Sequence, residues 1–291
     1  MTRMLRDSVA AWRADYAPSM GAALSYYMIF SIAPLLVIVI AIAGLAFGAE
    51  AASGAIFEQM RGMVGDDGAA AIQGLVKSAS KPSTSIFAAA LGLITLVLGA
   101  TSVLGELQTA LDRIWRAPPV SEHGWWRLLR ARLLSLGMIL VIGFLLLVSL
   151  VLSAAIVAIG DWWGPWFGKM RWLLEAANFA VSFVVVTALF AMIYKMLPRV
   201  RIAWRDVWIG AGVTALLFTA GKFAIGLYIG KSGVSSGFGA AGSLVVLLVW
   251  VYYSAQIFLL GAEFTAIYTY RHGCSPCDQR PPLLAARAAS E

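Results

Sequence analysis

Long apolar segments recur along this chain and constrain its fold more than any other feature. The clearest runs from Leu133 to Ile159 without a charged residue. A helix of about 20 apolar residues crosses the hydrocarbon of a bilayer, where backbone polar groups must bond to one another. Hydrophobic residues make up 60% of the 291 residues and charged residues only 13%, roughly half the share of a soluble domain. We therefore predict an all-α, polytopic transmembrane helix bundle and no soluble enzyme.

Six spans are expected within a single domain over residues 1–272. The first apolar segment is too long for a signal peptide and lacks a clear small-residue cleavage site, so it is expected to remain as an anchor. Residues 273–291 are rich in Pro, Ala and Arg and are predicted to form a disordered cytoplasmic tail. The predicted spans cover residues 20–47, 85–107, 132–160, 172–196, 207–229 and 240–269.

Lysine and arginine are unevenly distributed between the segments that join these spans. The N-terminus, the second loop, the fourth loop and the C-terminus together hold 15 of the 22, and the segments on the alternate side hold six. Positive residues are retained in the cytoplasm. Both termini are therefore predicted to be cytoplasmic, which agrees with an even number of spans.

One connection on the predicted outer side, about residues 49–84, is long. Apolar residues recur there at roughly helical spacing, first between Ala55 and Val64 and then between Ala69 and Val76. Gly65-Asp66-Asp67-Gly68 separates the two stretches. We predict a short amphipathic helical hairpin on the outer surface of the bundle.

Lys222 lies inside a predicted span, where a charge costs about 2.5–3.5 kcal/mol on insertion scales. Its stem could carry the amine to the outer headgroups, or the amine could bind an anion or a carboxylate inside the bundle. Helix geometry places Glu175 and Asn178 at a similar depth, with Gln256 below them. Glu263 lies nearer the cytoplasm, because the last span runs inward. The predicted outer polar group, the candidate substrate site, is Lys222, Asn178, Glu175 and Gln256.

A second polar group is predicted toward the cytoplasmic ends of the spans. It comprises Glu106, Glu263 and Tyr26. The simpler interpretation is that both glutamates are solvated at the membrane interface near Arg113 and Arg116, and we favour it.

Proline and glycine mark places where a helix could break or open. Pro34 removes one backbone hydrogen bond from the first span, which occurs both in gates and in static spans. The Gly/Ser-rich stretch from Gly230 to Gly242 is either a gate whose N–H groups face an anion or a tight turn before close packing. The candidates for a helix break or gate are Pro34, Gly230, Gly237, Gly239 and Gly242.

Enzymatic, metal and cofactor sites are not expected. His123 and His272 are both predicted at cytoplasmic surfaces and cannot form a histidine cluster or a hydrolytic triad. Cys274 and Cys277 offer too few ligands for a metal. Gly230-Lys231-Ser232 lacks the first glycine and the preceding strand of a phosphate-binding loop. No nucleic-acid partner is expected.

A run of aromatic and polar residues, WVYYSAQIFLLGAEF from Trp250 to Phe264, distinguishes the last predicted span. Further motifs are ALSYY from Ala23, FSxxPLL from Phe30, YxxLP from Tyr194 and SGFGAAGSL from Ser236. From about residue 8 to 270, the chain resembles the YihY/BrkB family. The resemblance implies a six-span protein of the bacterial inner membrane with a role in the cell envelope. Phe238 departs from the family, which often has tyrosine there.

The same family has carried the label ribonuclease BN. This sequence argues against that activity, because it offers no metal-ligand set for phosphodiester cleavage. Two other functions fit its residues better. One is transport or flipping of an anionic or amphiphilic envelope substrate, and the other is a non-transporting partner or scaffold for envelope-assembly machinery. The expected partners are membrane lipids, with envelope proteins or a second copy of the chain as further candidates.

Overall fold

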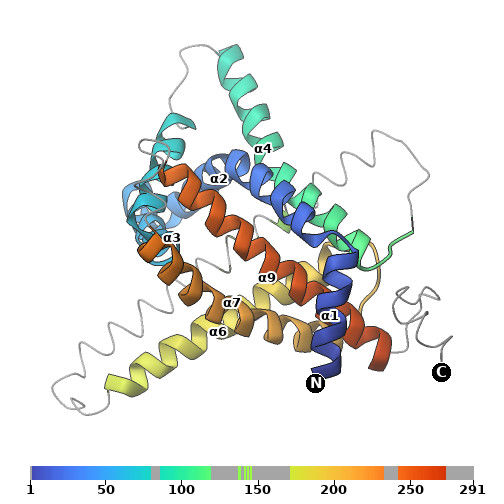
Figure 1. Cartoon of the computed structure of the whole chain (residues 1–291). Helices are drawn as coiled ribbons and strands as arrows, with labels where there is room; N and C mark the ends of the chain where they lie inside the picture. The colour runs from blue at the N-terminus through green and yellow to red at the C-terminus, as the bar shows by residue number, and fades with distance from the viewer. Residues whose placement is uncertain are drawn as a thin grey trace.

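The computed structural model describes residues 2–79, 86–118, 171–232 and 242–272, together with residues 137, 138, 141, 143 and 145. In these ranges every regular element is a helix (Figure 1). Most of the predicted third span, the turn at 233–241 and the predicted tail lie outside the described residues. The helices are α1 (Thr2–Ala14), α2 (Ala17–Phe47), α3 (Ala49–Ala79), α4 (Ile86–Ile114), α6 (Arg171–Met196), α7 (Trp204–Ser232) and α9 (Gly242–His272).

Four helices among the described residues are long and apolar enough to cross a membrane. They cover Ala17–Leu45, Ala176–Met196, Trp204–Ile225 and Leu244–His272. These segments coincide with the first, fourth, fifth and sixth predicted spans. Helix α4 coincides with the second predicted span but is not among the four. The helical membrane architecture is confirmed, whereas six spans and the positions of the termini stay predictions.

The sequence explains where α2 begins and ends. Pro18 lies in its first turn, where a missing N–H breaks no helical hydrogen bond. Gly48 follows its last residue with a φ of 86°, and the Gly48 N–H donates to the Gly44 carbonyl. Glycine adopts this left-handed conformation without strain, and the chain enters α3 directly. Helix α2 continues across Pro34 without interruption, so the proposed role of Pro34 as a gate stays a prediction.

Residues 49–79 form one helix, α3, where two were predicted. It continues through residues 65–68 without interruption. Arg61, just before these residues, forms ion pairs of 2.8 Å with Glu58 and Asp66. The separation into two helices is therefore wrong. Each glycine costs a helix about 1 kcal/mol, and the burial of Ile72 and Val76 against α2 and α9 offsets that cost.

The two ends of α3 nevertheless lie near each other. A pocket of about 620 Å³ beside α2 is lined by Ser53 and Phe57 from the first half of α3 and by Gln73 and Lys77 from the second. A straight helix would place Ser53 and Lys77 about 36 Å apart. Helix α3 must therefore bend back, and this feature of the predicted hairpin is supported.

Helix α9 is the central element of the structure. It packs against α1, α2, α3, α4 and α7 and crosses the middle of Figure 1. Helices α1 and α2 run antiparallel to it: Asp7 on α1 pairs with Arg271, and Gly21 on α2 lies against Gln256. Farther along, Leu36 and Leu247 share one hydrophobic core. We call the contact between α2 and α9 the α2–α9 seam.

On its other side, α9 interlocks with α7 through two reciprocal contacts. A Cβ atom on Gly210 would overlap the Thr265 side chain, and one on Gly261 would overlap Thr214. Small residues of this kind let membrane helices approach closely. The Tyr194 hydroxyl lies 3.1 Å from Thr214 Oγ1 and donates to the Phe258 carbonyl at 2.8 Å, which joins α6 to the same contact.

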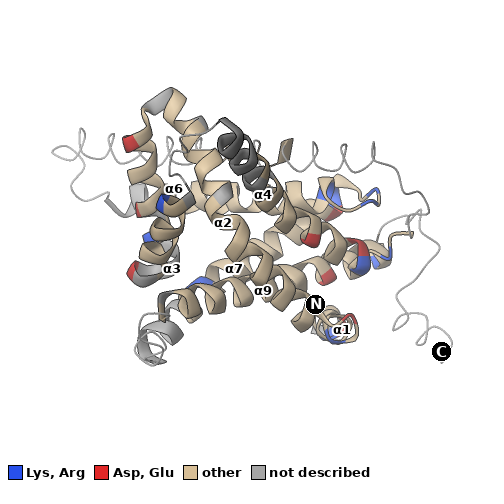
Figure 2. Cartoon of the chain, turned by 90° about the horizontal axis from the view of Figure 1, so that it is seen from above, with Lys and Arg blue, Asp and Glu red and all other residues tan. Residues whose placement is uncertain are grey.

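Charged residues gather where α1, the C-terminal end of α4 and the C-terminal end of α9 meet, and we call this the basic end. Figure 2 shows lysine and arginine mostly at this end, near the N-terminus. Arg61 and Lys77 lie on α3, a helix that Figure 2 shows away from the basic end, and Lys222 lies in the C-terminal half of α7. This segregation agrees with the uneven charge distribution found in the sequence.

Candidate functional site

The basic end contains a buried cluster of three charged residues. Asp15 lies between α1 and α2, Arg116 follows α4, and Glu263 lies on α9. Arg116 Nη2 and Asp15 Oδ1 are 2.6 Å apart, and the two side chains are 31% and 5% exposed. Glu263 is only 3% exposed and interacts with both Asp15 and Arg116. We call these residues the Asp15–Arg116–Glu263 cluster.

An unusual backbone conformation positions Arg116. The Arg116 N–H donates to the Arg113 carbonyl, and the Ala117 N–H donates to the Asp112 carbonyl. This pair of bonds ends α4 in the manner normally completed by a left-handed glycine. Arg116 occupies that position with a φ of 50°. Tyr16, next to Asp15, is the other non-glycine residue with positive φ in the described part of the chain. Strained residues of this kind gather at functional sites.

The cluster contains one more carboxyl group than it has positive charges. Arg116 pairs directly with Asp15, whereas Glu263 Oε1 is buried without a hydrogen-bond partner. Two helical turns earlier on α9, both polar atoms of the Gln256 amide are also buried without a partner. Residues seven apart share one helix face, so Glu263 and Gln256 line the α2–α9 seam together.

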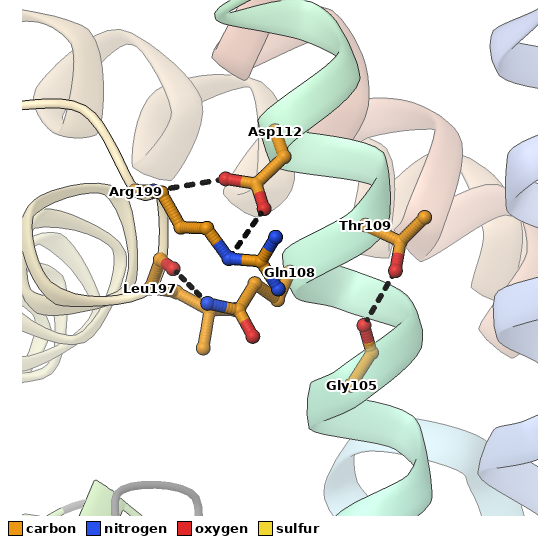
Figure 3. A network of polar contacts seen from close by, with 6 residues as sticks. All are labelled: Gly105, Gln108, Thr109, Asp112, Leu197 and Arg199. Carbon is orange, nitrogen blue, oxygen red and sulfur yellow. Dashed lines mark hydrogen bonds and ion pairs between the residues drawn. The ribbon is translucent and has the colours of Figure 1, made fainter. Parts of the chain in front are cut away.

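A hydrogen-bonded network fixes the end of α4 against the connection between α6 and α7 (Figure 3). The Arg199 N–H donates to Asp112 Oδ1 at 2.8 Å, and Arg199 Nε lies 3.3 Å from Oδ2. The Gln108 amide donates to the Leu197 carbonyl at 3.0 Å. Burial raises the pKa of the Asp112 carboxyl above its usual value, although Arg199 acts in the opposite direction.

The Asp112→Ala substitution should lower stability by about 1–2 kcal/mol, because it leaves the Arg199 N–H without its acceptor. The matched variant Asp112→Asn keeps that acceptor and should lose less. The folded wild type binds the Asp112 proton more tightly than the unfolded chain. Its stabilising contribution is therefore present at low pH and is lost as pH rises through the raised pKa. Thermal unfolding in detergent across a pH series should show this change in wild type and not in Asp112→Asn. Identical pH profiles would contradict it.

Comparison with known proteins establishes the relationship of this chain. The profile described as Virulence factor BrkB matches residues 8–282, nearly the whole sequence. The chain belongs to the BrkB family.

Several BrkB-family relatives are named as membrane proteins. The UPF0761 membrane protein of Tolumonas auensis is 32% identical over 66% of this chain and 59% of its own length. The UPF0761 membrane protein YihY of Salmonella typhimurium is 30% identical over 60% of this chain and 58% of its own length. A relative from Verminephrobacter eiseniae is 26% identical over 88% and 59%. The chain thus spans less than two thirds of the length of these relatives. No solved structure matches it.

The predicted outer polar group of this BrkB-family chain lies on three helices. Lys222 on α7 places its amine 5.9 Å from the Phe223 ring centroid. Asn178 on α6 buries its Oδ1 without a partner, and Gln256 on α9 lies against Gly21. Glu175 belongs to α6, but its side chain is outside the described residues. No hydrogen bond or ion pair joins the other three where the structure describes them. Their shared site stays a prediction.

The predicted inner polar group is arranged differently from the sequence-based expectation. Glu263 is buried beside Asp15 and Arg116, so the interpretation of Glu263 as an interfacially solvated residue is wrong. Glu106 is half-buried on α4. Tyr26 is 60% exposed, with its ring 4.9 Å from that of Phe30. The sequence-based group did not include Asp15. Because Asp15 immediately precedes the first span, it lies at the same membrane depth as the C-terminal end of the last span.

The gate candidates are divided between helices and undescribed residues. Gly230 lies in the last turn of α7, which continues to Ser232, and Gly242 begins α9. Gly237 and Gly239 lie outside the described residues. The gate itself stays a prediction.

Proposed function

We propose that this protein transports or flips an anionic or amphiphilic envelope substrate across the bacterial inner membrane. The supporting observation is a set of buried polar atoms without partners on membrane-length helices. They include Asn178 Oδ1 on α6 and the Ser254 hydroxyl, the Gln256 amide and Glu263 Oε1 on α9. Each such group costs about 1–3 kcal/mol if nothing bonds to it. A substrate or a file of water would supply the missing partners.

Lys222 supplies the positive charge for an anionic substrate in this proposal. It is half-buried and lies about 15 Å along α7 from the last residue of that helix. Its amine faces an aromatic ring, an arrangement that stabilises a cation by about 0.5–1 kcal/mol at exposed sites. Among the described side chains, no carboxylate forms an ion pair with it. Its amine is therefore available to an anionic headgroup.

The proposal also assigns a direction to the bundle. Lysine and arginine at the basic end would face the cytoplasm, which places both termini inside and Lys222 in the outer half. A substrate would then move along α9 between Lys222, Gln256 and the Asp15–Arg116–Glu263 cluster.

Lipid scrambling by the full chain in proteoliposomes tests the proposal. The probe is fluorescent phosphatidylglycerol, with fluorescent phosphatidylcholine as the neutral comparison. An impermeant reductant bleaches the fluorescent lipid in the outer leaflet. Inner-leaflet lipid should reach the reductant much faster in vesicles that contain the wild-type protein than in protein-free vesicles. The Lys222→Met variant should lose about tenfold in rate or more, since a hydrogen bond to a charged group contributes about 1.5–3 kcal/mol.

Lys77→Met is the matched control, because it removes an exposed lysine from α3. It should retain the wild-type rate. Equal rates in wild type and Lys222→Met would remove Lys222 from the mechanism. Absence of flux with this lipid and with other anionic envelope lipids would contradict transport. It would favour a non-transporting partner of envelope proteins or of a second copy of the chain.

A further inference from the structure

The α2–α9 seam contains a buried acid that forms no ion pair of its own among the described residues. Glu263 is 3% exposed, and its Oε1 has no hydrogen-bond partner. Asp15, its neighbour, already receives the Arg116 guanidinium at 2.6 Å. If both carboxyls were ionised, the cluster would hold a net negative charge away from water. Two neighbouring carboxyl groups in such a place retain a proton between them.

The charged groups around the cluster leave this excess uncompensated. From α1, Asp7 is paired with Arg271 of α9. From the end of α4, Asp112 is paired with Arg199, and Arg113 lies 5.6 Å from the ring centroid of Tyr16. Asp206 is buried in the first turn of α7, where the helix dipole favours its negative charge. Helix α3 packs on the opposite half of α9. The remaining titratable groups with described side chains on these elements are Arg3, Arg6 and Arg13 of α1, Tyr26 and Tyr27 of α2, Glu106 of α4, Tyr194 and Lys195 of α6, Arg205 and Lys222 of α7, and Tyr252, Tyr253, Tyr268, Tyr270 and His272 of α9.

We propose that Asp15 and Glu263 form a binding site for one exchangeable proton and that loading this site drives the transport cycle. The second half of the inference rests on the proposed transport function, and the proton site does not. In the loaded state, a proton from water resides on the Glu263 carboxyl, whose O–H donates to the Asp15 carboxylate. The net charge of the cluster then changes from −1 to zero.

A proton fits this site better than a metal ion. Hard cations require about six oxygen ligands, and the described residues contain no group of three His, Cys, Asp or Glu side chains that could hold one. The Asp15 carboxylate is also already paired with the Arg116 guanidinium, whose positive charge would repel a metal cation. Gln256, two turns along the same face of α9 and without partners, can both donate and accept hydrogen bonds. It would extend the proton path about 10 Å into the bundle.

Infrared titration of the purified full chain tests the proton site without requiring transport. Wild type should show a protonated carboxyl C=O band that shifts in D2O and disappears as pH rises. The isosteric Glu263→Gln variant should lose this band. Glu58→Gln is the control, because it removes an exposed glutamate on α3, and it should keep the band. Persistence of the band in Glu263→Gln would overturn the assignment.

The Asp15→Asn variant provides a second measurement if Glu263→Gln does not fold. It should shift the band, because the Glu263 O–H would then meet an amide in place of a carboxylate. An unshifted band would overturn the pairing of Asp15 with Glu263. A sodium-induced change in the wild-type carboxylate bands at constant pH, absent from Glu263→Gln, would overturn the proton in favour of a metal cation.

Flux in proteoliposomes with and without a pH gradient tests the coupling. Wild-type flux should respond to the gradient, and in Glu263→Gln the ratio of flux with the gradient to flux without it should fall to one. Wild-type flux that ignores the gradient would overturn the coupling while leaving the proposed function intact. Absence of wild-type flux would overturn both the proposed function and the coupling, and the infrared titration would still decide whether the proton site exists.

Discussion

Replacing Gly210 by alanine is expected to destabilise the bundle by about 1–3 kcal/mol, the usual cost of forcing an extra carbon into a packed interior. The new Cβ would overlap the Thr265 side chain on α9. Thr265 cannot simply rotate away, because it is fully buried and its hydroxyl donates to the Gly261 carbonyl at 2.7 Å. The same argument applies to Gly261→Ala, whose Cβ would meet Thr214. Thermal unfolding in detergent measures the loss.

Helix α7 contains a matched control for this prediction. A Cβ on Gly212 would meet no atom within 4 Å, so Gly212→Ala should be neutral or slightly stabilising, since alanine favours helix over glycine by up to about 1 kcal/mol. Combining Gly210→Ala with Thr265→Ala removes the overlapping atoms and should restore much of the lost stability. If Gly210→Ala unfolds at the same temperature as Gly212→Ala, α7 and α9 do not interlock at this position.

The Arg116→Ala substitution is expected to cost about 3 kcal/mol. Loss of the guanidinium leaves Asp15 and Glu263 facing each other without a positive charge, and breaking a buried pair in this way typically costs 3–5 kcal/mol. We place the effect at the lower bound because the Arg116 side chain is 31% exposed. Arg116→Gly should cost less than Arg116→Ala, because glycine also relieves the left-handed backbone at this position.

Two further variants separate this charge effect from general damage to the end of α4. Arg113→Ala removes an exposed arginine whose contact is with the Tyr16 ring, so it should cost less than about 1 kcal/mol. Adding Asp15→Asn to Arg116→Ala removes one of the unpaired carboxylates and should recover part of the loss. Equal destabilisation by Arg113→Ala and Arg116→Ala would contradict the assigned role of Arg116.

The sequence predicted the parts of the fold that depend on hydrophobic length. Apolar segments of span length located α2, α6, α7 and α9 to within a few residues. It did not predict α1, because the segment from Thr2 to Ala14 is polar on one face and is held by tertiary packing on α9, including the ion pair between Asp7 and Arg271. The bend of α3 also depends on contacts with α2 that no local pattern encodes.

The site was harder to predict than the fold. Depth along each helix correctly placed Glu263 near Arg116, but depth does not specify which helix face meets which neighbour. Asp15 and Glu263 are separated by most of the chain, so only the antiparallel packing of α2 on α9 brings them together. The glycines at the tightest contact, Gly210 and Gly261, carry no local signal because their partners are threonines on another helix.

The α2–α9 seam has a consequence for how the protein is made. Its two helices lie at opposite ends of the chain, and chains emerge from the ribosome N-terminus first. The first span must therefore reside in the lipid without one of its main neighbours until the last helix inserts. Until then, Asp15 lacks Glu263, and Gly21 leaves a gap that only Gln256 fills. Insertion of α9 is thus the step that completes the bundle. A chain truncated before α9 would expose the face of α2 that α9 normally covers to membrane proteases.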